Sequence, residues 1–457
     1  MASERETSAG ASPGRAVPGP AAAPPTGLLT DHYELTMLSA ALRSGAAGRR
    51  AVFELFARHL PHGRRYGVVA GTGRLLDALE RFQFPPSELE FLADTGVVDE
   101  QACRYLESFR FSGNIWGYAE GDCYFPGSPI LVVEGTFAEA VVLETLALSV
   151  LNHDCAIASA ASRMVTAAGG RPLIEMGSRR THELAAVASA RAAYIAGFAT
   201  TSNLRAGRDY GVPTSGTAAH AFTLVHDSER GAFGAQLAAL GKATTLLVDT
   251  SDVTRAVRTA IELAGPGLGA VRIDSGDLAA VARQVREQLD QLGADRTRIV
   301  LTGDLDEHSI AALAAAPVDG YGVGTALVTG SGAATAALVY KLVARSLEPG
   351  AGAPLRPVAK HSVGKPSRGG RKWALRRRGK AGTAVAEVVS TEPPEPSPAD
   401  RELLVPLVRQ GEIVGREPLQ AVRDRHQAVL AELPPHARQL SRGYPAIPTV
   451  FIPNGSS

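Results

Sequence analysis

The densest group of chemically versatile residues follows an apolar run at Val271-Arg-Ile-Asp-Ser-Gly-Asp277. Asp274 and Asp277 are three positions apart across a turn that opens a helix. Carboxylates so placed can bind ribose hydroxyls or a cation, while the flanking backbone N–H groups favour an anion. Arg272 puts a charge inside an otherwise apolar strand, and such a charge needs a partner. The alternative is that Ser275 and Asp277 only cap the helix that follows.

Two later clusters place glycines at the ends of successive apolar runs, Thr302-Gly-Asp304 and Tyr321-Gly-Val-Gly-Thr325. Glycines at consecutive strand ends let backbone amides approach a phosphate, as at the last strands of a phosphate-binding barrel. A dinucleotide-binding fingerprint is the alternative, but Leu327 stands where that fingerprint needs its third glycine. The sequence therefore favours a phosphate site here.

His220 closes another cluster, Gly216-Thr-Ala-Ala-His220. A histidine can accept a phosphoryl group on a ring nitrogen or act as an acid or base, and both roles require it to line the pocket. A lone histidine is more often structural, but the neighbouring clusters favour a functional role for this one. Arg179 and Arg180 precede a helix, and their guanidinium groups suit a carboxylate or phosphate. We expect Arg179 to bind the substrate.

A basic stretch near residues 360–380 interleaves Gly and Ser with cations: Lys360, Lys365, Arg368, Arg371 and Lys372. It fits a loop that closes over polyphosphate, although a solvated face or a nucleic-acid patch is also open. The whole chain has 47 basic and 46 acidic residues and a net charge of +1. No global field therefore steers it toward nucleic acid or a membrane surface, and we expect small-molecule substrates.

Cysteine usage and the apolar runs suggest a cytoplasmic location. Cys103, Cys123 and Cys155 are an odd number without a CxxC pair, so neither a disulfide framework nor a metal site is expected. The first 26 residues lack the apolar core of a secretory signal and are expected to form a disordered tail. Gly, Pro or charge interrupts every apolar run before the roughly 20 residues of a membrane span, so no membrane crossing is expected.

The elements that position these clusters form a repeat from Leu173 to Thr325. A short apolar run, a polar cluster and a helix-length amphipathic stretch alternate, which is the pattern of a parallel α/β barrel whose strand ends converge on one pocket. The helix predicted over 277–292 has one apolar face and a glycine stop. A helix over 333–344 is expected to end the repeat. Outside it, a helix is expected within 28–45 and strands at 51–58, 114–118, 130–133 and 383–389.

Further ordered motifs accompany these clusters. They are Thr30-Asp-His-Tyr-Glu-Leu-Thr-Met37, Phe53-Glu-Leu-Phe56 with Arg58, Glu134-Gly-Thr136, Glu144-Thr145, Met176-Gly-Ser-Arg-Arg180, Thr201-Ser-Asn203 and Gly216-Thr-x-x-His220. In this order, from Leu29 to about Lys372, the chain resembles nicotinate phosphoribosyltransferase, a type II phosphoribosyltransferase family. The resemblance implies an irregular α/β barrel with a flanking α+β domain built from N- and C-terminal segments. The expected divisions are a tail at 1–26, an N-terminal α+β domain at 27–140, the barrel at 141–345 and a C-terminal segment at 346–457.

The resemblance also implies a reaction and a homodimer with shared active sites. Nicotinate and phosphoribosyl pyrophosphate would give nicotinate mononucleotide and pyrophosphate for NAD salvage, coupled to ATP hydrolysis with Mg²⁺ on the diphosphate. His220 would be the phosphorylated histidine, and Asp274 would stabilise the positive charge that develops on the sugar.

The remaining site residues are implied by the same resemblance. Those for nicotinate are Tyr33, donated by the neighbouring subunit, with Arg179, Thr217 and Arg272. Those for the phosphoribosyl group and its phosphate are Ser275, Gly303, Asp304, Gly324 and Thr325. Those for diphosphate or ATP are Arg58, Lys360, Ser362, Lys365 and Lys372.

One position bears on specificity, and two others depart from the family pattern. Ser202 stands where nicotinamide-specific relatives carry an aspartate, which favours nicotinate. Met176 replaces a frequent ring-stacking aromatic residue, and Ser251 replaces a tyrosine. The alternatives are a quinolinate or nicotinamide phosphoribosyltransferase, or a catalytically silent sugar-phosphate-binding protein; His220, Asp274 and Thr325 together argue against the silent protein.

Overall fold

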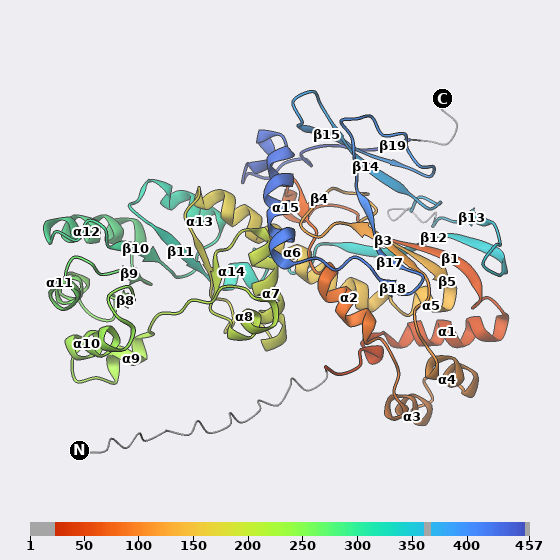
Figure 1. Cartoon of the computed structure of the whole chain (residues 1–457), viewed down its shortest axis with the longest axis horizontal. Coiled ribbons are helices and arrows are strands. Elements are labelled where there is room, and N and C mark those ends of the chain that lie inside the picture. The colour runs from red at the N-terminus through yellow and green to blue at the C-terminus, as the bar shows by residue number, and fades with distance from the viewer. Residues whose placement is uncertain (1–22, 361–366, 453–457) are drawn as a thin grey trace, which may run out of the picture.

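The computed structural model describes residues 23–360 and 367–452 and combines a parallel sheet with mainly antiparallel ones. In Figure 1 the parallel sheet lies to the left, the antiparallel sheets lie to the right, and the long helix α6 (Glu144–Ala168) lies between them. This confirms the expected α/β class.

The parallel sheet has six strands in the order β7-β6-β11-β10-β9-β8. They are β6 (Leu173–Glu175), β7 (Thr200–Thr201), β8 (Thr245–Leu247), β9 (Ala270–Ile273), β10 (Arg298–Leu301) and β11 (Gly320–Val323). Over the described residues β7 and β8 are its two edges, so the barrel is an open half-barrel. The register pairs Ile273 with Leu301 and Leu301 with Tyr321. The residues that follow these strands therefore emerge side by side at one edge.

Helices alternate with these strands, as the repeat predicted. They are α7 (Glu183–Ala196), α8 (Leu204–Tyr210), α9 (His220–Leu224), α10 (Glu229–Leu240), α11 (Val253–Ala264), α12 (Leu278–Gln291), α13 (Glu307–Ala312) and α14 (Thr325–Val328). The Asp277 carboxylate accepts from the backbone N–H of Ala280 and caps α12. The capping alternative is thus correct for Asp277 but not for Ser275, whose hydroxyl donates to Asp249.

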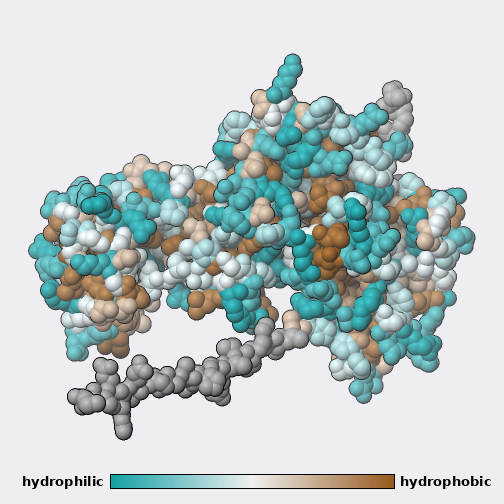
Figure 2. Space-filling model, viewed as in Figure 1, coloured by the Kyte–Doolittle hydropathy of each residue, from teal (hydrophilic) through white to brown (hydrophobic). Residues whose placement is uncertain are grey.

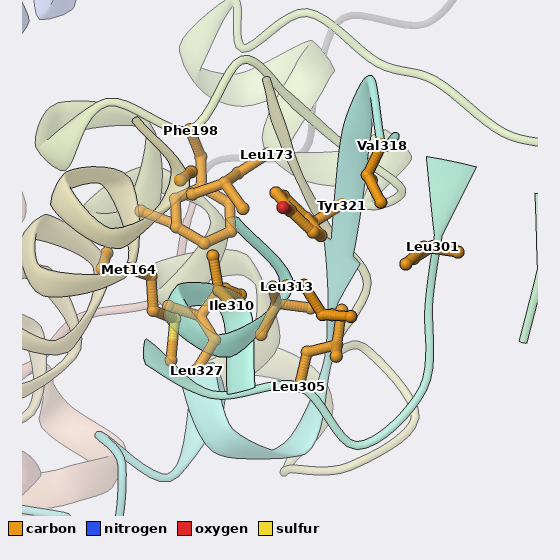
Figure 3. Close-up of a cluster of buried hydrophobic side chains, with 14 of the residues drawn as sticks. Met164, Leu173, Phe198, Leu301, Leu305, Ile310, Leu313, Val318, Tyr321 and Leu327 are labelled. Atoms are coloured by element: carbon orange, nitrogen blue, oxygen red, sulfur yellow. The ribbon is translucent and has the colours of Figure 1, made fainter. Parts of the chain in front are cut away.

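A large apolar core joins the parallel sheet to α6. Figure 3 shows Leu173, Tyr321 and Leu301 of the sheet in one apolar cluster with Met164 of α6, Phe198 and Leu327. The expectation that no apolar run is long enough for a membrane span is wrong by length and composition, since one helical stretch, Phe137–Ala168, passes that test among the described residues. However, 67% of its most apolar window is buried inside the protein, as in the core helix of a globular fold.

The antiparallel region interleaves N- and C-terminal segments, as expected for the flanking domain. Its seven-stranded sheet has the order β13-β12-β1-β5-β3-β17-β18. The strands are β1 (Arg49–Ala57), β3 (Asn114–Tyr118), β5 (Leu131–Thr136), β12 (Leu338–Pro349), β13 (Leu355–Pro357), β17 (Leu404–Arg409) and β18 (Glu412–Ile413).

Smaller elements complete this region. A two-stranded sheet pairs β2 (Gly67–Val68) with β4 (Cys123–Tyr124), and a four-stranded sheet has the order β16-β14-β15-β19. The latter's strands are β14 (Trp373–Arg378), β15 (Ala384–Ser390), β16 (Arg401–Glu402) and β19 (Thr449–Ile452). The surrounding helices are α1 (His32–Ser44), α2 (Thr72–Glu80), α3 (Pro86–Asp94), α4 (Glu100–Glu107), α5 (Phe137–Val141) and α15 (Leu419–Glu432).

Two local expectations are corrected. The helix predicted over 333–344 is wrong, because residues 338–349 form β12, which pairs with β1 on one side and β13 on the other. Leu338 and Tyr340 are buried and alternate with less buried neighbours, which is the two-residue period of a strand. The helical spacing of apolar residues in this segment was the weaker pattern. Of the predicted tail, residues 1–22 lie outside the described residues, but Thr26 is buried and its hydroxyl donates to the carbonyl of Ala78.

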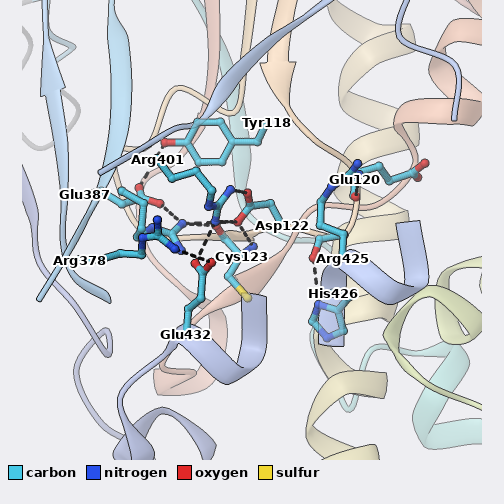
Figure 4. A network of polar contacts seen from close by, with 12 residues as sticks. Tyr118, Glu120, Asp122, Cys123, Arg378, Glu387, Arg401, Arg425, His426 and Glu432 are labelled. Atoms are coloured by element: carbon cyan, nitrogen blue, oxygen red, sulfur yellow. Dashed lines mark hydrogen bonds and ion pairs between the residues drawn. The ribbon is translucent and has the colours of Figure 1, made fainter. Parts of the chain in front are cut away.

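A buried ionic network holds the four-stranded sheet against the N-terminal region (Figure 4). Arg376, fully buried on β14, donates to Glu387 of β15 at 2.6 Å and lies 3.6 Å from Asp122. Arg401 donates to the same Asp122 at 2.6 Å. Since a buried charge is tolerated only when paired, these contacts fix the C-terminal strands to the turn before β4.

Candidate active site

A polar pocket of about 270 Å³ opens at the carboxyl edge of the parallel sheet. Its lining comes from the carboxyl ends of β9 and β11 and from the segments after β6, β9, β10 and β11: Met176, Arg179, Arg180, Arg272, Asp274, Thr302, Gly303, Asp304, Gly322, Gly324 and Thr325. The structure therefore brings together most of the residues expected to bind nicotinate and the phosphoribosyl group.

Arg272 on β9 is held by partners from three segments. Its Nε donates to the Thr302 hydroxyl at 2.8 Å, and its Nη1 donates to the Thr217 hydroxyl at 3.0 Å and to the Ala218 carbonyl at 3.3 Å. Its Nη2 donates to Asp274 Oδ1 at 2.9 Å. The charge inside the apolar strand thus has its partner, and the guanidinium plane is fixed beside the pocket.

Asp274 is ionised in this setting. Burial alone would raise its pKa, but hydrogen bonds from Thr302 and Arg272, together with the charges of Arg272 and His220, outweigh burial and hold the pKa below its usual value. The carboxylate is therefore negative at neutral pH.

His220 is the first residue of α9, and its ring faces two carboxylates. Nδ1 lies 3.0 Å from the Thr250 hydroxyl, while Nε2 lies 3.9 Å from Asp249 Oδ1 and 4.0 Å from Asp274 Oδ2. The last two distances exceed a hydrogen bond, so Nε2 is the ring nitrogen left open to a ligand. Among the described residues no strand runs directly into the His220 cluster; Thr214, two residues before Gly216, forms only an isolated bridge with Thr201 of β7.

Asp249 was not predicted from the sequence as a site residue. Its Oδ2 accepts from the backbone N–H of Asp274 at 2.8 Å and from the Ser275 hydroxyl at 2.7 Å. Its Oδ1 is buried and has no hydrogen-bond partner in the described part of the chain. Asp249 thus supports the turn that carries Asp274 and directs a free oxygen toward His220. Its position directly after the β8 run was the available signal.

The glycines of the pocket allow neighbouring strand ends to pack closely, because a side chain at these positions would collide with them. Gly303 has a φ of +130°, and a side chain there would approach the Asp274 carbonyl at 3.2 Å. A Cβ at Gly322 would lie 2.6 Å from the Thr302 methyl and 2.7 Å from the Met176 sulfur. With Gly324, these positions leave main chain exposed to the pocket where the sequence predicted a phosphate.

The residues expected to bind diphosphate or to stack on the nicotinate ring lie outside this polar pocket. Tyr33 is 45% exposed on α1, and burial followed by the charge of Glu144 raises its pKa to about 12. Figure 1 shows α1 and α9 at opposite ends of the long axis. Tyr33 and His220 of one chain therefore do not meet.

Arg58 and Lys372 share a second pocket, of about 360 Å³, beside Glu54, Arg368 and Phe451. The Lys372 ammonium is bound to Glu54 Oε2 at 2.5 Å, whereas Arg368 lies over the Phe451 ring at 3.9 Å. Lys360 is exposed, and the predicted ligands Ser362 and Lys365 lie outside the described residues.

Among residues 23–360 and 367–452, no group of three or more His, Cys, Asp or Glu side chains is arranged to hold a metal ion.

Comparison with known proteins gives consistent results. The family described as nicotinate phosphoribosyltransferase (NAPRTase) N-terminal domain matches residues 28–152. The nicotinate phosphoribosyltransferase pncB1 of Mycobacterium tuberculosis is 60% identical over 439 residues, which are 94% of this chain and 96% of that protein. The nicotinate phosphoribosyltransferase of Bacillus subtilis is 39% identical over 327 residues, 69% of this chain and 66% of that one.

Two solved structures have a similar fold. Human nicotinic acid phosphoribosyltransferase matches with a TM-score of 0.79 and 26% identity, covering 93% of this chain and 97% of that one. Nicotinate-nucleotide pyrophosphorylase from Pyrococcus furiosus matches with a TM-score of 0.73 and 24% identity, covering 89% and 95%. At that identity the second likeness is one of fold alone.

Proposed function

The chain belongs to the nicotinate phosphoribosyltransferase family, and we propose that it transfers phosphoribose from phosphoribosyl pyrophosphate to nicotinate, with ATP hydrolysis coupled through His220. The product would be nicotinate mononucleotide for NAD salvage. The observation that carries the proposal is the meeting of His220, Arg272 and Asp274 at one edge of the parallel sheet, next to glycine-lined main chain.

Nicotinate recognition is assigned to Arg272, Thr217 and Arg179. Thr217 bonds to the guanidinium of Arg272, and Arg179 lines the same pocket, so the three groups form a cationic, hydrogen-bonding end of the site. A charge-assisted hydrogen bond contributes about 1.5–3 kcal/mol, roughly a 10- to 100-fold preference for the nicotinate anion over neutral nicotinamide.

Transfer breaks the bond between the anomeric carbon and diphosphate and forms a bond from that carbon to the pyridine nitrogen. The sugar gains oxocarbenium character as diphosphate leaves, and the Asp274 carboxylate stabilises it because its low pKa keeps it ionised. The main chain at Gly303, Gly324 and Thr325 would bind the 5′-phosphate, with Ser275 and Asp304 near the ribose.

The coupling to ATP is assigned to Nε2 of His220. If Nδ1 donates its proton to the Thr250 hydroxyl, Nε2 keeps a free lone pair that can attack the γ-phosphorus while ADP leaves. Water later breaks the new phosphorus–nitrogen bond and releases phosphate. Mg²⁺ accompanying the polyphosphate would supply charge neutralisation there.

A head-to-tail homodimer would complete the site. Tyr33 lies on α1, and Arg58, Lys360 and Lys372 adjoin β1, β13 and β14, all on the opposite side of the molecule from α9 in Figure 1. A second copy would therefore have to bring Tyr33 onto the nicotinate ring and the cations onto diphosphate. Ser362 and Lys365 would join them. The paired Lys372 would act mainly by its charge near Arg58.

Exposed apolar side chains support such an interface. Figure 2 shows hydrophobic side chains gathered over the region of α9 and α10. Large exposed apolar residues there are Leu224, Val225 and Leu240, and others near α1 are Leu28 and Leu29. Contiguous exposed apolar surface commonly marks a protein interface. The division into a barrel at 141–345 and flanking segments, and a cytoplasmic location, belong to the same proposal.

The test is an assay of the purified protein with phosphoribosyl pyrophosphate and each of nicotinate, nicotinamide and quinolinate, with and without ATP. Nicotinate mononucleotide formed from nicotinate and stimulated by ATP is expected. Carbon dioxide release from quinolinate without ATP dependence would favour the quinolinate enzyme. Binding of phosphoribosyl pyrophosphate without turnover of any of the three would favour a silent binding protein.

A further inference from the structure

Thr302 directly follows β10, and its side chain lies between two residues on which the proposed function depends. The residue is 2% exposed, and its backbone N–H donates to the Ile273 carbonyl of β9 at 2.9 Å. Arg272 and Asp274 flank Ile273 in the chain. A hydroxyl buried at this point must find hydrogen-bond partners, and those within reach are the reactive side chains themselves.

The direction of the two hydrogen bonds is determined by chemistry. Nε of Arg272 is only a donor, so the Thr302 oxygen accepts from it, at 2.8 Å. The single hydroxyl proton is then free to point to Asp274 Oδ1, with which Thr302 is in close contact. Thr302 thus accepts from the Arg272 guanidinium and donates to the Asp274 carboxylate. These two bonds add to the direct contact between Arg272 and Asp274.

The methyl group of Thr302 keeps the hydroxyl in this orientation. It points to Gly322 on β11, where a Cβ would come within 2.6 Å of it and within 2.7 Å of the Met176 sulfur. The absence of a side chain at Gly322 therefore makes room for the methyl group. Rotating the side chain to exchange hydroxyl and methyl would place an apolar group against two charges.

We propose that Thr302 is a positioning residue for phosphoribosyl transfer: its hydroxyl holds Arg272 in the plane that receives the nicotinate carboxylate and holds Asp274 at the sugar. The inference rests on the proposed function and deepens it. Thr302 itself is not assigned a contact with the reacting atoms.

Loss of the hydroxyl would also alter the titration of Asp274. Burial opposes ionisation of Asp274, and the Thr302 bond is the leading influence that favours it, so removal of the bond raises the pKa. The substitution removes none of the other charged groups that face Asp274 or share its pocket: His220, Asp249, Arg272, Arg179, Arg180 and Asp304.

Thr302→Val and Thr302→Ser separate the hydroxyl from the methyl. Valine keeps the shape and removes the hydroxyl, so a roughly 10- to 100-fold fall in kcat, a higher KM for nicotinate and an acidic limb of the pH–rate profile displaced to higher pH are expected. Serine keeps the hydroxyl and should retain kcat within a few-fold. The profile should then keep its wild-type acidic limb.

Thr297→Val is the matched control. Thr297 lies just before β10, is 1% exposed, and has a hydroxyl without a partner among the described residues. Its replacement removes a buried hydroxyl from the same segment but should leave kcat, the KM for nicotinate and the pH profile unchanged. Tm of every variant is measured in parallel.

The outcomes distinguish this inference from the proposed function. If wild-type protein makes no nicotinate mononucleotide, the proposed function itself fails. If wild-type protein is active and Thr302→Val lowers only Tm, with kcat, KM and the pH profile as in Thr297→Val, then Thr302 is merely structural and the positioning role is overturned.

Discussion

The ammonium of Lys372 lies 2.5 Å from Glu54 Oε2, and both side chains are only 3% exposed. The same ammonium donates to the Arg368 carbonyl at 2.8 Å, which ties the basic segment to β1. Arg371 adds a second tie, since its Nε donates to Glu134 at 2.8 Å. The two ion pairs hold the segment that the sequence assigned to diphosphate against the seven-stranded sheet.

Breaking the Glu54–Lys372 pair should destabilise the protein. Lys372→Met leaves the buried Glu54 carboxylate without its cation and should cost about 3–5 kcal/mol in the free energy of unfolding. The double variant Glu54→Gln with Lys372→Met removes both charges and should recover much of that loss. Guanidinium chloride unfolding measures both. A wild-type KM for phosphoribosyl pyrophosphate in the double variant would show that Lys372 does not bind diphosphate.

His220→Ala should abolish ATP-dependent phosphorylation. The open Nε2 is the only part of the residue assigned to the phosphoryl group, so labelling from γ-labelled ATP and stimulation by ATP should both disappear while slow basal transfer remains. The label on wild-type protein should be acid-labile. His308→Ala, an exposed histidine on α13, is the control and should label normally. Persistent label in His220→Ala would refute the assignment.

Arg272→Ala should raise the KM for nicotinate far more than the KM for ATP. Loss of the charge-assisted contact predicts roughly a 10- to 100-fold increase for the anionic substrate. Arg230, whose guanidinium makes an exposed ion pair with Glu262, provides the control Arg230→Ala. Equal increases for both substrates would indicate that Arg272 acts only by supporting the pocket.

Mixed dimers test the shared site. His220→Ala and Tyr33→Ala are each expected to form poorly active homodimers, but a heterodimer would hold one site with both wild-type residues. Random pairing of co-expressed subunits should therefore restore about a quarter of the wild-type sites. Activity equal to the mean of the two parent variants would mean that each site is built from one chain.

Acid should destabilise the fold through His426. This buried residue of α15 contacts Ser162 and the Gly121 carbonyl, and burial lowers its pKa from 6.5 to about 4. Between these values the unfolded chain binds a proton that the folded chain does not, so stability falls as pH decreases from about 6.5 to about 4. A pKa shift of this size corresponds to a loss of roughly 3 kcal/mol in the free energy of unfolding.

Urea unfolding at pH 7 and pH 4.5 measures this loss. His426→Gln keeps an amide that can bond to Ser162 and to the Gly121 carbonyl but does not titrate. Its stability should change less between the two pH values than that of the wild-type protein. An identical change in both proteins would show that other groups control the acid response.

Local patterns predicted the parts of the fold that depend on local physics. The period of the helix at 277–292 and its N-terminal Asp277 are contained in one segment, and α12 forms there with Asp277 as its cap. The strand β12 was missed because its stability comes from β1, almost 300 positions earlier, and not from its own spacing. Tertiary pairing of this kind overrides a weak local preference.

Site residues could be proposed from the sequence where the side chain itself carries a characteristic functional group. His220, Arg272 and Asp274 carry ionisable groups in the polar clusters of the sequence, and in the structure Asp274 lies 4.0 Å from His220 and 2.9 Å from Arg272. The individual roles of Asp249 and Thr302 were not predicted, since an aspartate or threonine at a strand end commonly caps a helix. Their roles depend on which strands are neighbours and in what register, and a single sequence does not contain that information.

The pairing of β1 with β12 also has a consequence for synthesis of the chain. Arg50 bonds through its backbone N–H to Ser346, 296 positions later, in the middle of the seven-stranded sheet. A nascent polypeptide leaving the ribosome must therefore carry β1 with an unpaired side until more than 340 residues have been translated. During that interval one side of β1 is an exposed strand edge, and termination of translation before Leu338 would leave it as an aggregation-prone edge.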